Sequence, residues 1–311
     1  MNRQAFLYND YSSYLRKTFG CKVQKISINA GFTCPNRDGT KGRGGCTYCN
    51  NQTFNPEYCD NEKSIRRQIE EGKAFFAHKY PDMKYLAYFQ AYTNTYGDIE
   101  SLRSKYEEAL SADGIVGITI ATRPDCISDS LLQYLSQLSR QTYVMVEYGI
   151  ESTSDDMLKH INRGHDFATA ADAVKQTAAA GINTGAHMIL GLPGDDAETI
   201  MSQPAILSEL PLKTLKLHQL QIIRGTRMAK EYEQTPERFR LFGMDEYIDT
   251  IIGYIERLRP DMVLERFVTQ SPDHLLIAPH WGLKNYEFVE KLKKRMTGRN
   301  TYQGRLYKCR M

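Results

Sequence analysis

Short apolar runs, rich in β-branched and aromatic side chains, recur along residues 23–221 between longer segments of helical period. The runs occupy residues 23–28, 84–90, 115–121, 142–148, 182–190 and 214–221. From the second run onward their starts lie 31, 27, 40 and 32 residues apart, a spacing that favours βα units in a parallel sheet over hairpins. Six strands are fewer than the eight of a closed TIM barrel. We therefore predict an α/β fold built on a partial (βα)6 TIM-like barrel of parallel strands.

The helical segments carry recognisable ends. The clearest one begins after Asp166, a residue suited to cap a first turn, and runs through an alanine-rich stretch to Gly181. Beyond residue 221 the pattern loosens, with helical period at residues 225–233, 244–259 and 285–296 and a candidate strand at residues 263–270. No low-complexity linker divides the chain. We expect a basic N-terminal segment (residues 1–22), a core (23–221) and a C-terminal extension with a basic tail (222–311).

Composition is that of a soluble globular protein. Of the 311 residues, 41% are hydrophobic and 25% are charged, and no stretch approaches the roughly 18 consecutive apolar residues of a membrane span. The first residues, MNRQAFLYNDYSSYLRK, lack the apolar core of a signal peptide. We expect a cytoplasmic protein with no membrane partner, in a compartment that keeps thiols reduced.

The net charge of +3 is unevenly distributed. Residues 288–311 hold a single acidic residue, Glu290, against eight basic ones: Lys291, Lys293, Lys294, Arg295, Arg299, Arg305, Lys308 and Arg310. Residues 1–25 are basic as well. Basic termini suit the phosphates of a nucleic acid, but the stretch KLKKR at residues 291–295 is equally consistent with a solvated helix face.

Three of the seven cysteines are clustered directly after the first predicted strand, in CPNRDGTKGRGGCTYC at residues 34–49. Cys46 and Cys49 have the C-x2-C spacing of zinc and iron-sulfur sites, and Cys34 precedes them in the same loop. A structural zinc site would need a fourth ligand, for which Cys59 is available. A [4Fe-4S] cluster held by three thiolates would instead leave one iron open. For each of the four scattered cysteines, Cys21, Cys59, Cys126 and Cys309, an ordinary buried or surface thiol is the favoured interpretation.

The glycine-rich cysteine block at residues 31–49 resembles the GFxCPNRDGTxxxGGCTFC block of the bacterial YhcC/YtqA-type radical S-adenosylmethionine (SAM) family. Over nearly its whole length the chain resembles the Elongator-catalytic-domain-like branch of the radical SAM superfamily. The resemblance implies that Cys34, Cys46 and Cys49 bind a [4Fe-4S] cluster whose open iron holds the amino and carboxylate groups of SAM. One electron would then cleave SAM to methionine and a 5′-deoxyadenosyl radical. The resemblance assigns no catalytic residue beyond these three cysteine ligands.

Further blocks at the predicted strand ends agree with this resemblance. Residues 121–125 (ATRPD), which contain Thr122, resemble the Elongator TRPD segment, with Ala121 where that domain has Glu. In residues 148–152 (YGIES), Glu151 replaces a glutamine that contacts the SAM ribose, and a carboxylate accepts the same hydroxyl bonds. Residues 162–165 match the family's NRGH, which implies that Arg163 approaches the SAM carboxylate through its planar guanidinium.

Two other strand ends complete the implied SAM site. Residues 187–194 (HMILGLPG) resemble the apolar segment behind the adenine and supply His187, Ile189 and Gly191. Residues 90–95 (QAYTNT) lack the glycines that usually hold the methionine amino group, so Gln90, Thr93 and Asn94 are the candidate substitutes. Tyr48, between the paired cysteines, would shield the cluster and the adenine from water. Without the resemblance, Arg163 would read as a surface ion-pair residue and His187 as a core histidine.

The Elongator resemblance and the basic termini make tRNA the leading candidate substrate, through modification of a wobble uridine. Two alternatives stay open. One is a radical SAM enzyme for a small molecule or tetrapyrrole, because related blocks occur in oxygen-independent coproporphyrinogen oxidase; the other is a non-catalytic, zinc-binding RNA-binding protein. A radical SAM enzyme would also need a reductant of the flavodoxin or ferredoxin type.

Overall fold

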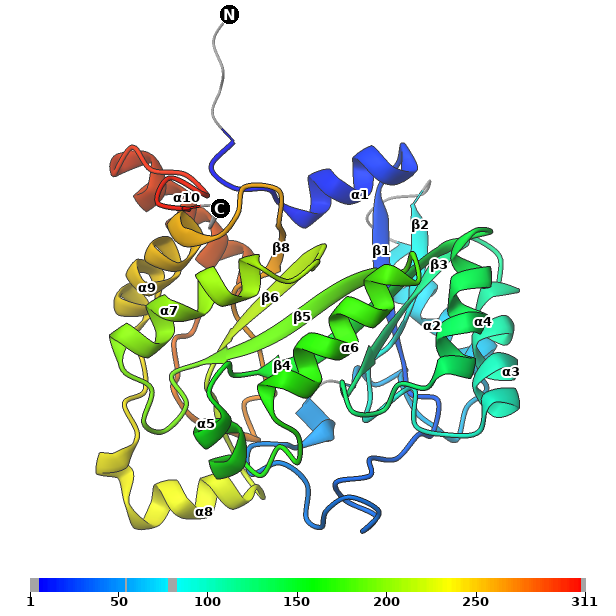
Figure 1. The fold of residues 1–311 in the computed structure, drawn as a ribbon, viewed down its shortest axis with the longest axis horizontal. Helices are drawn as coiled ribbons and strands as arrows, with labels where there is room; N and C mark the ends of the chain where they lie inside the picture. Colours follow the sequence, from blue (N-terminus) through cyan, green and yellow to red (C-terminus); the bar gives the residue numbers. More distant parts are fainter. Residues whose placement is uncertain (1–5, 54, 78–82, 309–311) are drawn as a thin grey trace, which may run out of the picture.

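A curved sheet of seven parallel strands forms the centre of the computed structural model, which describes residues 6–53, 55–77 and 83–308 (Figure 1). The strands follow one another across the sheet in the order β1-β2-β3-β4-β5-β6-β8. Their bounds are β1 Val23–Ile28, β2 Lys84–Phe89, β3 Ile115–Thr122, β4 Tyr143–Glu151, β5 Asn183–Leu190, β6 Thr214–Gln219 and β8 Val263–Arg266. A small antiparallel pair, β7 (Ile222–Ile223) and β9 (Leu276–Ala278), lies beside the sheet.

The predicted partial TIM-like barrel is confirmed, with one strand more than the six expected. The seventh strand, β8, pairs with β6 and comes from the segment that we treated as an extension. The candidate strand expected at residues 263–270 is therefore present, over the four residues Val263–Arg266, but it belongs to the main sheet. The division of the chain at residue 221 stays a prediction.

Helices connect successive strands, because parallel neighbours require a crossover. Their bounds are α1 Tyr11–Phe19, α2 Ile65–Ala77, α3 Ile99–Leu110, α4 Asp129–Ser139, α5 Asp155–His160, α6 Phe167–Ala179, α7 Ala197–Ser208, α8 Arg227–Gln234, α9 Met244–Arg257 and α10 Asn285–Gly298. Two 3-10 turns, Asn51–Thr53 and Pro236–Arg238, complete the inventory of the described residues. As predicted, the Asp166 side chain caps α6 by accepting the Thr169 N–H, and Gly181 follows the helix with a left-handed φ of 79°.

The concave side of the sheet carries buried charges instead of an apolar filling. Lys25 of β1 pairs with Glu147 of β4 at 2.5 Å and with Glu265 of β8 at 2.7 Å, and Lys216 of β6 pairs with Glu147 at 2.6 Å. These four residues, called the charge layer below, connect the first strand with the last. Because seven strands do not close a barrel, the Lys25–Glu265 pair bridges the open seam between β1 and β8.

The two ends of the barrel differ in what covers them. The loop after β1, at residues 29–50, lies with α8 at the end where the strands finish, the lower end in Figure 1. Helices α1 and α10 lie at the opposite end. Working groups gather at the carboxyl ends of parallel strands, so the lower end is where a site is expected. Within the residues described, no helix combines the length and the apolar character needed to cross a membrane.

Candidate active site

The cysteine loop, residues 29–50, is folded by its own backbone. The Cys34 carbonyl accepts N–H bonds from Arg37 at 2.8 Å and Asp38 at 3.2 Å, and Cys49 donates its N–H to the Cys46 carbonyl at 3.1 Å. Gly45 has φ +73°, and a Cβ there would lie 2.9 Å from the Arg37 Nε. The glycines therefore let the loop turn tightly between its cysteines.

Two other segments clamp this loop from both sides. The Asn36 amide donates to the Asn162 carbonyl at 2.6 Å, and the Asn162 amide donates to the Gly45 carbonyl at 2.8 Å. On the other side, the first turn of α8 donates the Met228 N–H to the Thr47 carbonyl at 2.9 Å. The positions of the thiols are thus set by the NRGH segment and by α8. Asn36 is buried, and its side-chain amide bonds the NRGH segment. The sequence analysis did not select it as a site residue.

A cavity of about 190 Å³ lies between this loop and the carboxyl ends of the strands. Eleven of the thirteen predicted site residues line it: Cys34, Cys46, Tyr48, Cys49, Gln90, Thr93, Thr122, Glu151, Arg163, His187 and Ile189. They come from the cysteine loop, from β2 to β5 or the residues that follow these strands, and, in the case of Arg163, from the segment between α5 and α6. The fold therefore brings together residues that are distant in the sequence, as the prediction of one common site requires; their individual roles stay predictions.

Two predicted residues do not line the cavity. The Asn94 side chain is fully buried and donates to the carbonyls of Phe89 and Ala121, at 3.1 and 2.8 Å, which joins the ends of β2 and β3. At Gly191, which has φ +84°, a Cβ would lie 2.8 Å from the ring of Phe242. Neither residue borders the cavity in this structure, and the cofactor-binding roles expected of them stay predictions.

Burial shapes the thiols of the loop. The Cys46 Sγ accepts from Arg163 Nη1 at 3.4 Å, and the Cys49 Sγ accepts from the Asn51 amide at 3.6 Å. Burial and the neighbouring Cys46 raise the pKa of Cys49 to about 11. The Cys49 thiol therefore keeps its proton at neutral pH in the free protein.

The four-cysteine zinc alternative does not fit the structure. Cys59 is 4% exposed, belongs to the main hydrophobic core and lies off the cavity wall, with its thiol 3.8 Å from the Asn55 side-chain oxygen. Among the described residues, no three Cys, His, Asp or Glu side chains converge closely enough to bind a single metal ion. Cys59 is therefore not placed to complete a four-cysteine site with the three thiols of the cavity.

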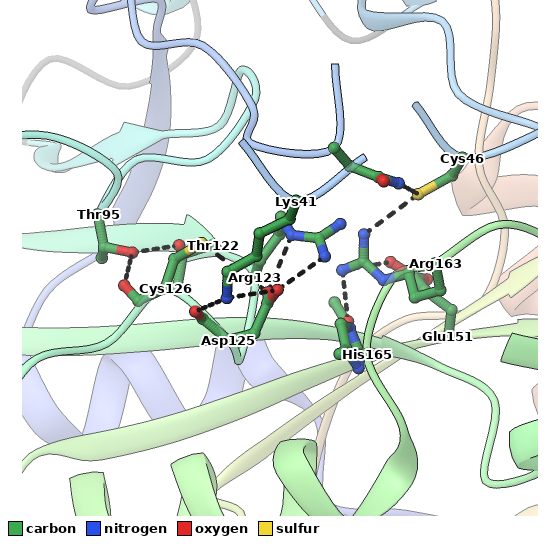
Figure 2. A network of polar contacts seen from close by, with 12 residues as sticks. Lys41, Cys46, Thr95, Thr122, Arg123, Asp125, Cys126, Glu151, Arg163 and His165 are labelled. Carbon is green, nitrogen blue, oxygen red and sulfur yellow. Dashed lines mark hydrogen bonds and ion pairs between the residues drawn. The ribbon is translucent and has the colours of Figure 1, made fainter. Parts of the chain in front are cut away.

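Arg163 is buried at the centre of the site, where Figure 2 shows it between Cys46 and Glu151. Its Nη2 donates to the Gly149 carbonyl at 2.6 Å and lies 3.8 Å from Glu151 Oε1. Its Nε is buried, and no described residue offers it a hydrogen-bond acceptor. The surface ion-pair reading of Arg163 is therefore wrong.

A second arginine, Arg123, stands next to it and is held by Asp125 (Figure 2). The Arg123 Nε and Nη2 donate to the two Asp125 carboxylate oxygens at 2.9 and 3.0 Å, and Lys41 of the cysteine loop reaches the same carboxylate at 2.9 Å. Although burial opposes ionisation, Arg123 and Lys41 lower the pKa of Asp125 to about 2. The TRPD block thus holds the cysteine loop in place through Asp125 and Lys41. Arg123 is a second site residue: it lies in a segment that the sequence analysis noted, but it was not itself predicted to belong to the site.

Three buried polar atoms around the cavity have no hydrogen-bond partner in the part of the chain that the structure describes: Thr93 Oγ1, Arg123 Nη1 and Arg163 Nε. Buried polar groups are almost always paired in folded proteins, since an unpaired one costs about 1–3 kcal/mol. Their clustering on one wall indicates a polar ligand. Two guanidinium groups suit the carboxylate of an amino acid, and a hydroxyl suits its amino group. The residues present therefore fit the methionine part of a bound SAM.

The backbone near the cavity is strained at defined points. Glu151 adopts φ +72° and Tyr92 adopts φ +63°, values that non-glycine residues rarely take. The register between β4 and β5 shifts at Gly149/Glu151, a bulge that turns the Glu151 side chain toward Tyr48 and Arg163. Burial raises the pKa of Glu151, while Arg163 and a bond from Tyr48 oppose that shift. Strain of this kind persists where the surrounding structure holds a side chain in place for function.

His187 lies deeper in the cavity and is oriented by the charge layer. Its Nε2 is 3.1 Å from Glu147 Oε2, while Lys216 bonds the same oxygen. Burial and the Lys216 ammonium lower the pKa of His187 to about 4 despite the bond to Glu147. The ring is therefore a neutral, fixed wall of the cavity at physiological pH.

Comparisons with known proteins agree with this geometry. The sequence profile described as the Radical SAM superfamily matches residues 32–202, and that of the Radical_SAM C-terminal domain matches residues 212–298. The chain is 35% identical over 300 residues to YtqA of Bacillus subtilis (strain 168), covering 96% of this chain and 92% of that protein. It is 36% identical over 276 residues to YhcC of Escherichia coli (strain K12), covering 88% and 87%.

A solved structure shares the fold. The archaeal Methanocaldococcus infernus Elp3 with an N-terminal deletion superposes with a TM-score of 0.66 at 18% identity. The match covers 90% of this chain and 64% of that chain. The present chain thus spans less than two thirds of that protein's length, and the likeness concerns the barrel architecture.

Proposed function

The chain belongs to the radical SAM superfamily of enzymes, and from that premise we propose that it modifies tRNA, with a wobble uridine as the target. We further propose that Cys34, Cys46 and Cys49 hold a [4Fe-4S] cluster. When bound, the cluster supplies the electron that cleaves SAM and so generates the 5′-deoxyadenosyl radical. The observation that carries this proposal is the single cavity on which the three thiols meet Thr93, Glu151 and Arg163.

The roles of the chain's own residues follow from their unpaired atoms. Arg163 offers a buried Nε to the SAM carboxylate while its Nη2 stays anchored on the Gly149 carbonyl. Thr93, 1% exposed, offers a free hydroxyl to the amino group, and the Glu151 carboxylate accepts ribose hydroxyl bonds. Tyr48, from the loop between the paired cysteines, excludes water from above. A flavodoxin- or ferredoxin-type reductant would approach from the cysteine loop.

A group of exposed cations at the cysteine-loop end of the barrel, called the basic rim, supports an RNA substrate. Five residues form it, from the cysteine loop and from the segment that leads into α8: Arg37, Arg43, Arg224, Arg227 and Lys230. The two segments lie side by side, because the Asn50 amide donates to the Arg224 carbonyl at 3.2 Å and a Cβ at Gly44 would lie 3.6 Å from Arg227 Nη1. Cations clustered at a mouth attract phosphates and direct a nucleotide toward the cavity.

The C-terminal tail is less suited to this task than the sequence indicated. Arg295 pairs with Asp245 and Asp249 of α9, Arg299 pairs with Asp249, and Arg305 pairs with Glu256. Helix α10 also lies at the end of the barrel away from the cysteine loop. We therefore assign the phosphate contacts to the basic rim, not to the tail.

Salt dependence separates the two surfaces. A variant with Arg43, Arg227 and Lys230 changed to Ala should bind tRNA with a shallower slope of log affinity against log salt, by roughly 0.7–0.9 per lost phosphate contact. The matched control changes Lys291 and Lys294, two exposed residues of α10, and should keep the wild-type slope. Equal slopes for the wild-type protein and the rim variant would show that the basic rim does not bind tRNA phosphates.

The decisive test of the function is genetic. Nucleosides of total tRNA from cells with and without the intact gene should differ by one modified uridine or its precursor, measured by liquid chromatography and mass spectrometry. A Cys46→Ala allele should reproduce the deletion, because it removes a cluster ligand. Identical nucleoside profiles in all three strains would favour a small-molecule substrate instead.

A further inference from the structure

The last strand of the barrel carries two consecutive charged residues toward its concave side. In the pairing of β6 with β8, Leu215 lies opposite Leu264, but Lys216 lies opposite Arg266, so the register skips Glu265. Side chains alternate along a regular strand, and a bulge breaks that alternation. Glu265 contacts Lys25 and Lys216, while Arg266, the next residue, lines the same cavity as the three thiols.

Arg266 has no counter-ion within the part of the chain that the structure describes. No carboxylate lies within ion-pair distance of its guanidinium, and its Nε is buried without a partner. Both carboxylates of the charge layer bond the two lysines, Glu147 through both of its oxygens and Glu265 through Oε1. The second oxygen of Glu265, Oε2, has no partner among the described residues, but it lies beyond ion-pair distance of Arg266. A partly buried guanidinium left in this state is costly unless something binds it.

Counting the charges around the floor of the cavity leaves one positive charge in excess. Lys25, Lys216 and Arg266 are cationic, and Glu147 and Glu265 are anionic. The two histidines that face the cavity do not change this balance. Burial lowers the pKa of His187 to about 4 and that of His218 well below its usual value, so both rings are neutral. A monoanion would bring the floor to neutrality.

We propose that Arg266, at the floor of the cavity and beside the His218 ring, binds a carboxylate group of the molecule on which the enzyme acts. A planar guanidinium matches a carboxylate bidentately. A phosphate monoester, with a charge of about −1.5 to −2, would overcompensate a single excess charge. The proposal rests on the proposed function to this extent: the group held at the floor lies in the cavity where the radical is generated.

His218 completes the carboxylate site. Its ring lies 5.7 Å from that of His187 and lines the cavity, and no hydrogen bond joins either of its nitrogens to another of the described residues. One ring N–H is therefore free to donate to the second carboxylate oxygen. The side chain of Gln219, the next residue, is by contrast already bonded. Its amide oxygen accepts the Thr269 N–H at 3.0 Å and its amide nitrogen donates to the Thr269 carbonyl at 3.1 Å.

The carboxylate could come from two sources with the same chemistry. It could belong to a free carboxylic acid that serves as a co-substrate, or it could be carried by the side chain of a modified nucleotide in the RNA. The recognition by Arg266 is identical in both cases. The experiment below therefore tests the carboxylate site first and its source second.

Equilibrium dialysis of radiolabelled acetate tests the site directly. The cluster-loaded, oxidised protein is used with saturating SAM, so that the cations near the cysteine loop are occupied. Acetate should bind the wild-type protein and bind Arg266→Gln at least tenfold more weakly, as expected for a lost charge-assisted bond. Methylphosphonate should compete at least tenfold less well than unlabelled acetate. The matched control, Arg140→Gln on the exposed end of α4, should bind acetate like the wild type.

Stability distinguishes a binding arginine from a structural one. Because Arg266 carries an unpaired charge in the free protein, Arg266→Gln should unfold at the same temperature as the wild type or higher. A structural arginine would give the opposite result. A clear fall in melting temperature, absence of acetate binding by the wild type, or equal binding by Arg266→Gln would each overturn the proposal.

The source is identified from SAM cleavage under reducing conditions. If the carboxylate is carried by RNA, only tRNA should stimulate 5′-deoxyadenosine release, and Arg266→Gln should lose that stimulation while retaining tRNA binding. If it is a free acid, the small-molecule fraction of a cell extract should stimulate release instead, with the same dependence on Arg266. Stimulation by tRNA that persists in Arg266→Gln would contradict the carboxylate site but leave the proposed function intact. An absence of any tRNA effect would contradict the proposed function, while the dialysis result would still decide the site.

Discussion

The charge layer and the cavity wall near the cysteine loop are both buried and polar, yet they differ in how far their groups are paired. In the charge layer, Lys25, Glu147, Lys216 and Glu265 bond one another at 2.5–3.1 Å, and Glu265 Oε2 is the single side-chain atom of the four described residues that is buried without a partner. On the wall near the cysteine loop, polar atoms of Thr93, Arg123 and Arg163 have no partner among the described residues. The first arrangement closes the seam of an incomplete barrel. The second leaves donors directed at a cavity, which is the state expected of a binding site before its ligand arrives.

The same contrast separates the two basic surfaces. On α10, Arg295 and Arg299 are neutralised by Asp245 and Asp249 of the neighbouring helix. On the rim, Arg43 and Lys230 are exposed and engage no acidic group of the described residues. Charge counted along a sequence therefore does not locate a phosphate-binding surface, because pairing within the fold decides which cations remain available.

The largest predicted effect concerns the thiols. Changing Cys34, Cys46 or Cys49 to Ala should abolish retention of the [4Fe-4S] cluster after anaerobic reconstitution, because two thiolates hold it poorly. Iron and acid-labile sulfide analysis measures the result. Cys21→Ala, Cys59→Ala and Cys126→Ala are the controls and should keep about one cluster each. Loss of the cluster in Cys59→Ala would show that the cavity is not the site of ligation. Cys309, also predicted to be dispensable, lies outside the described residues.

Breaking the charge layer should mainly affect stability. Glu147→Gln leaves Lys25 and Lys216 without their shared counter-ion and should cost roughly 3–5 kcal/mol in the free energy of unfolding at pH 7. Lys216 and Lys25 lower the pKa of Glu147 well below its usual value despite burial. The stability that this carboxylate provides is therefore present above its unfolded pKa and lost as the pH falls through its folded pKa. Urea unfolding should show the gap between wild type and variant narrowing below about pH 4.3. A gap independent of pH would contradict this assignment.

Changes at Arg163 should affect ligand binding. Arg163→Ala should retain the cluster but bind SAM more weakly by roughly 1.5–3 kcal/mol, the contribution of a charge-assisted hydrogen bond. Arg163→Lys should recover only part of that affinity, because an ammonium cannot reproduce the guanidinium fork. SAM affinity is measured by equilibrium dialysis with the oxidised, cluster-loaded protein. Unchanged affinity in Arg163→Ala would show that its free Nε does not face the ligand.

The smallest effect is expected at the support beneath the loop. Asp125→Asn removes the carboxylate that Arg123 and Lys41 share and should cost roughly 2 kcal/mol of stability. The pKa of Asp125 is lowered to about 2, so this contribution is present at pH 7 and is lost as the pH falls from about 4 toward 2. Unfolding curves at pH 7 and pH 3 measure it. Lys41→Ala, which removes only one of the two partners, should give a smaller loss.

Much of the barrel could be predicted because its determinants are local. Apolar runs at βα spacing gave six of the strands within a few residues, and Asp166 with Gly181 marked a helix through its own capping chemistry. The cysteine loop was visible because three thiols and several glycines are concentrated in a short stretch. Eleven predicted residues line the cavity because strand ends are adjacent in any parallel barrel.

The remaining features depend on contacts that no local pattern records. β8 was expected only as a separate candidate strand in the C-terminal extension. Its bulge, which turns Arg266 inward, arises from a shift in register against β6, a strand distant in the sequence. Glu147 sits inside an apolar run and reads as an ordinary strand residue until Lys25 and Lys216 are placed around it. Asn94 and Gly191 lie in strand-end segments, as the prediction required, but neither reaches the cavity wall.

The central claim, radical SAM modification of tRNA, is tested most directly by reconstituting the reaction. Cluster-loaded protein, a flavodoxin reductant and SAM are incubated anaerobically with tRNA purified from cells that lack this gene, and both 5′-deoxyadenosine and tRNA nucleosides are quantified. The account predicts that a modified uridine appears in proportion to 5′-deoxyadenosine and that Arg163→Ala lowers both together. SAM cleavage that proceeds at the same rate with and without tRNA, leaving every nucleoside unchanged, would contradict it.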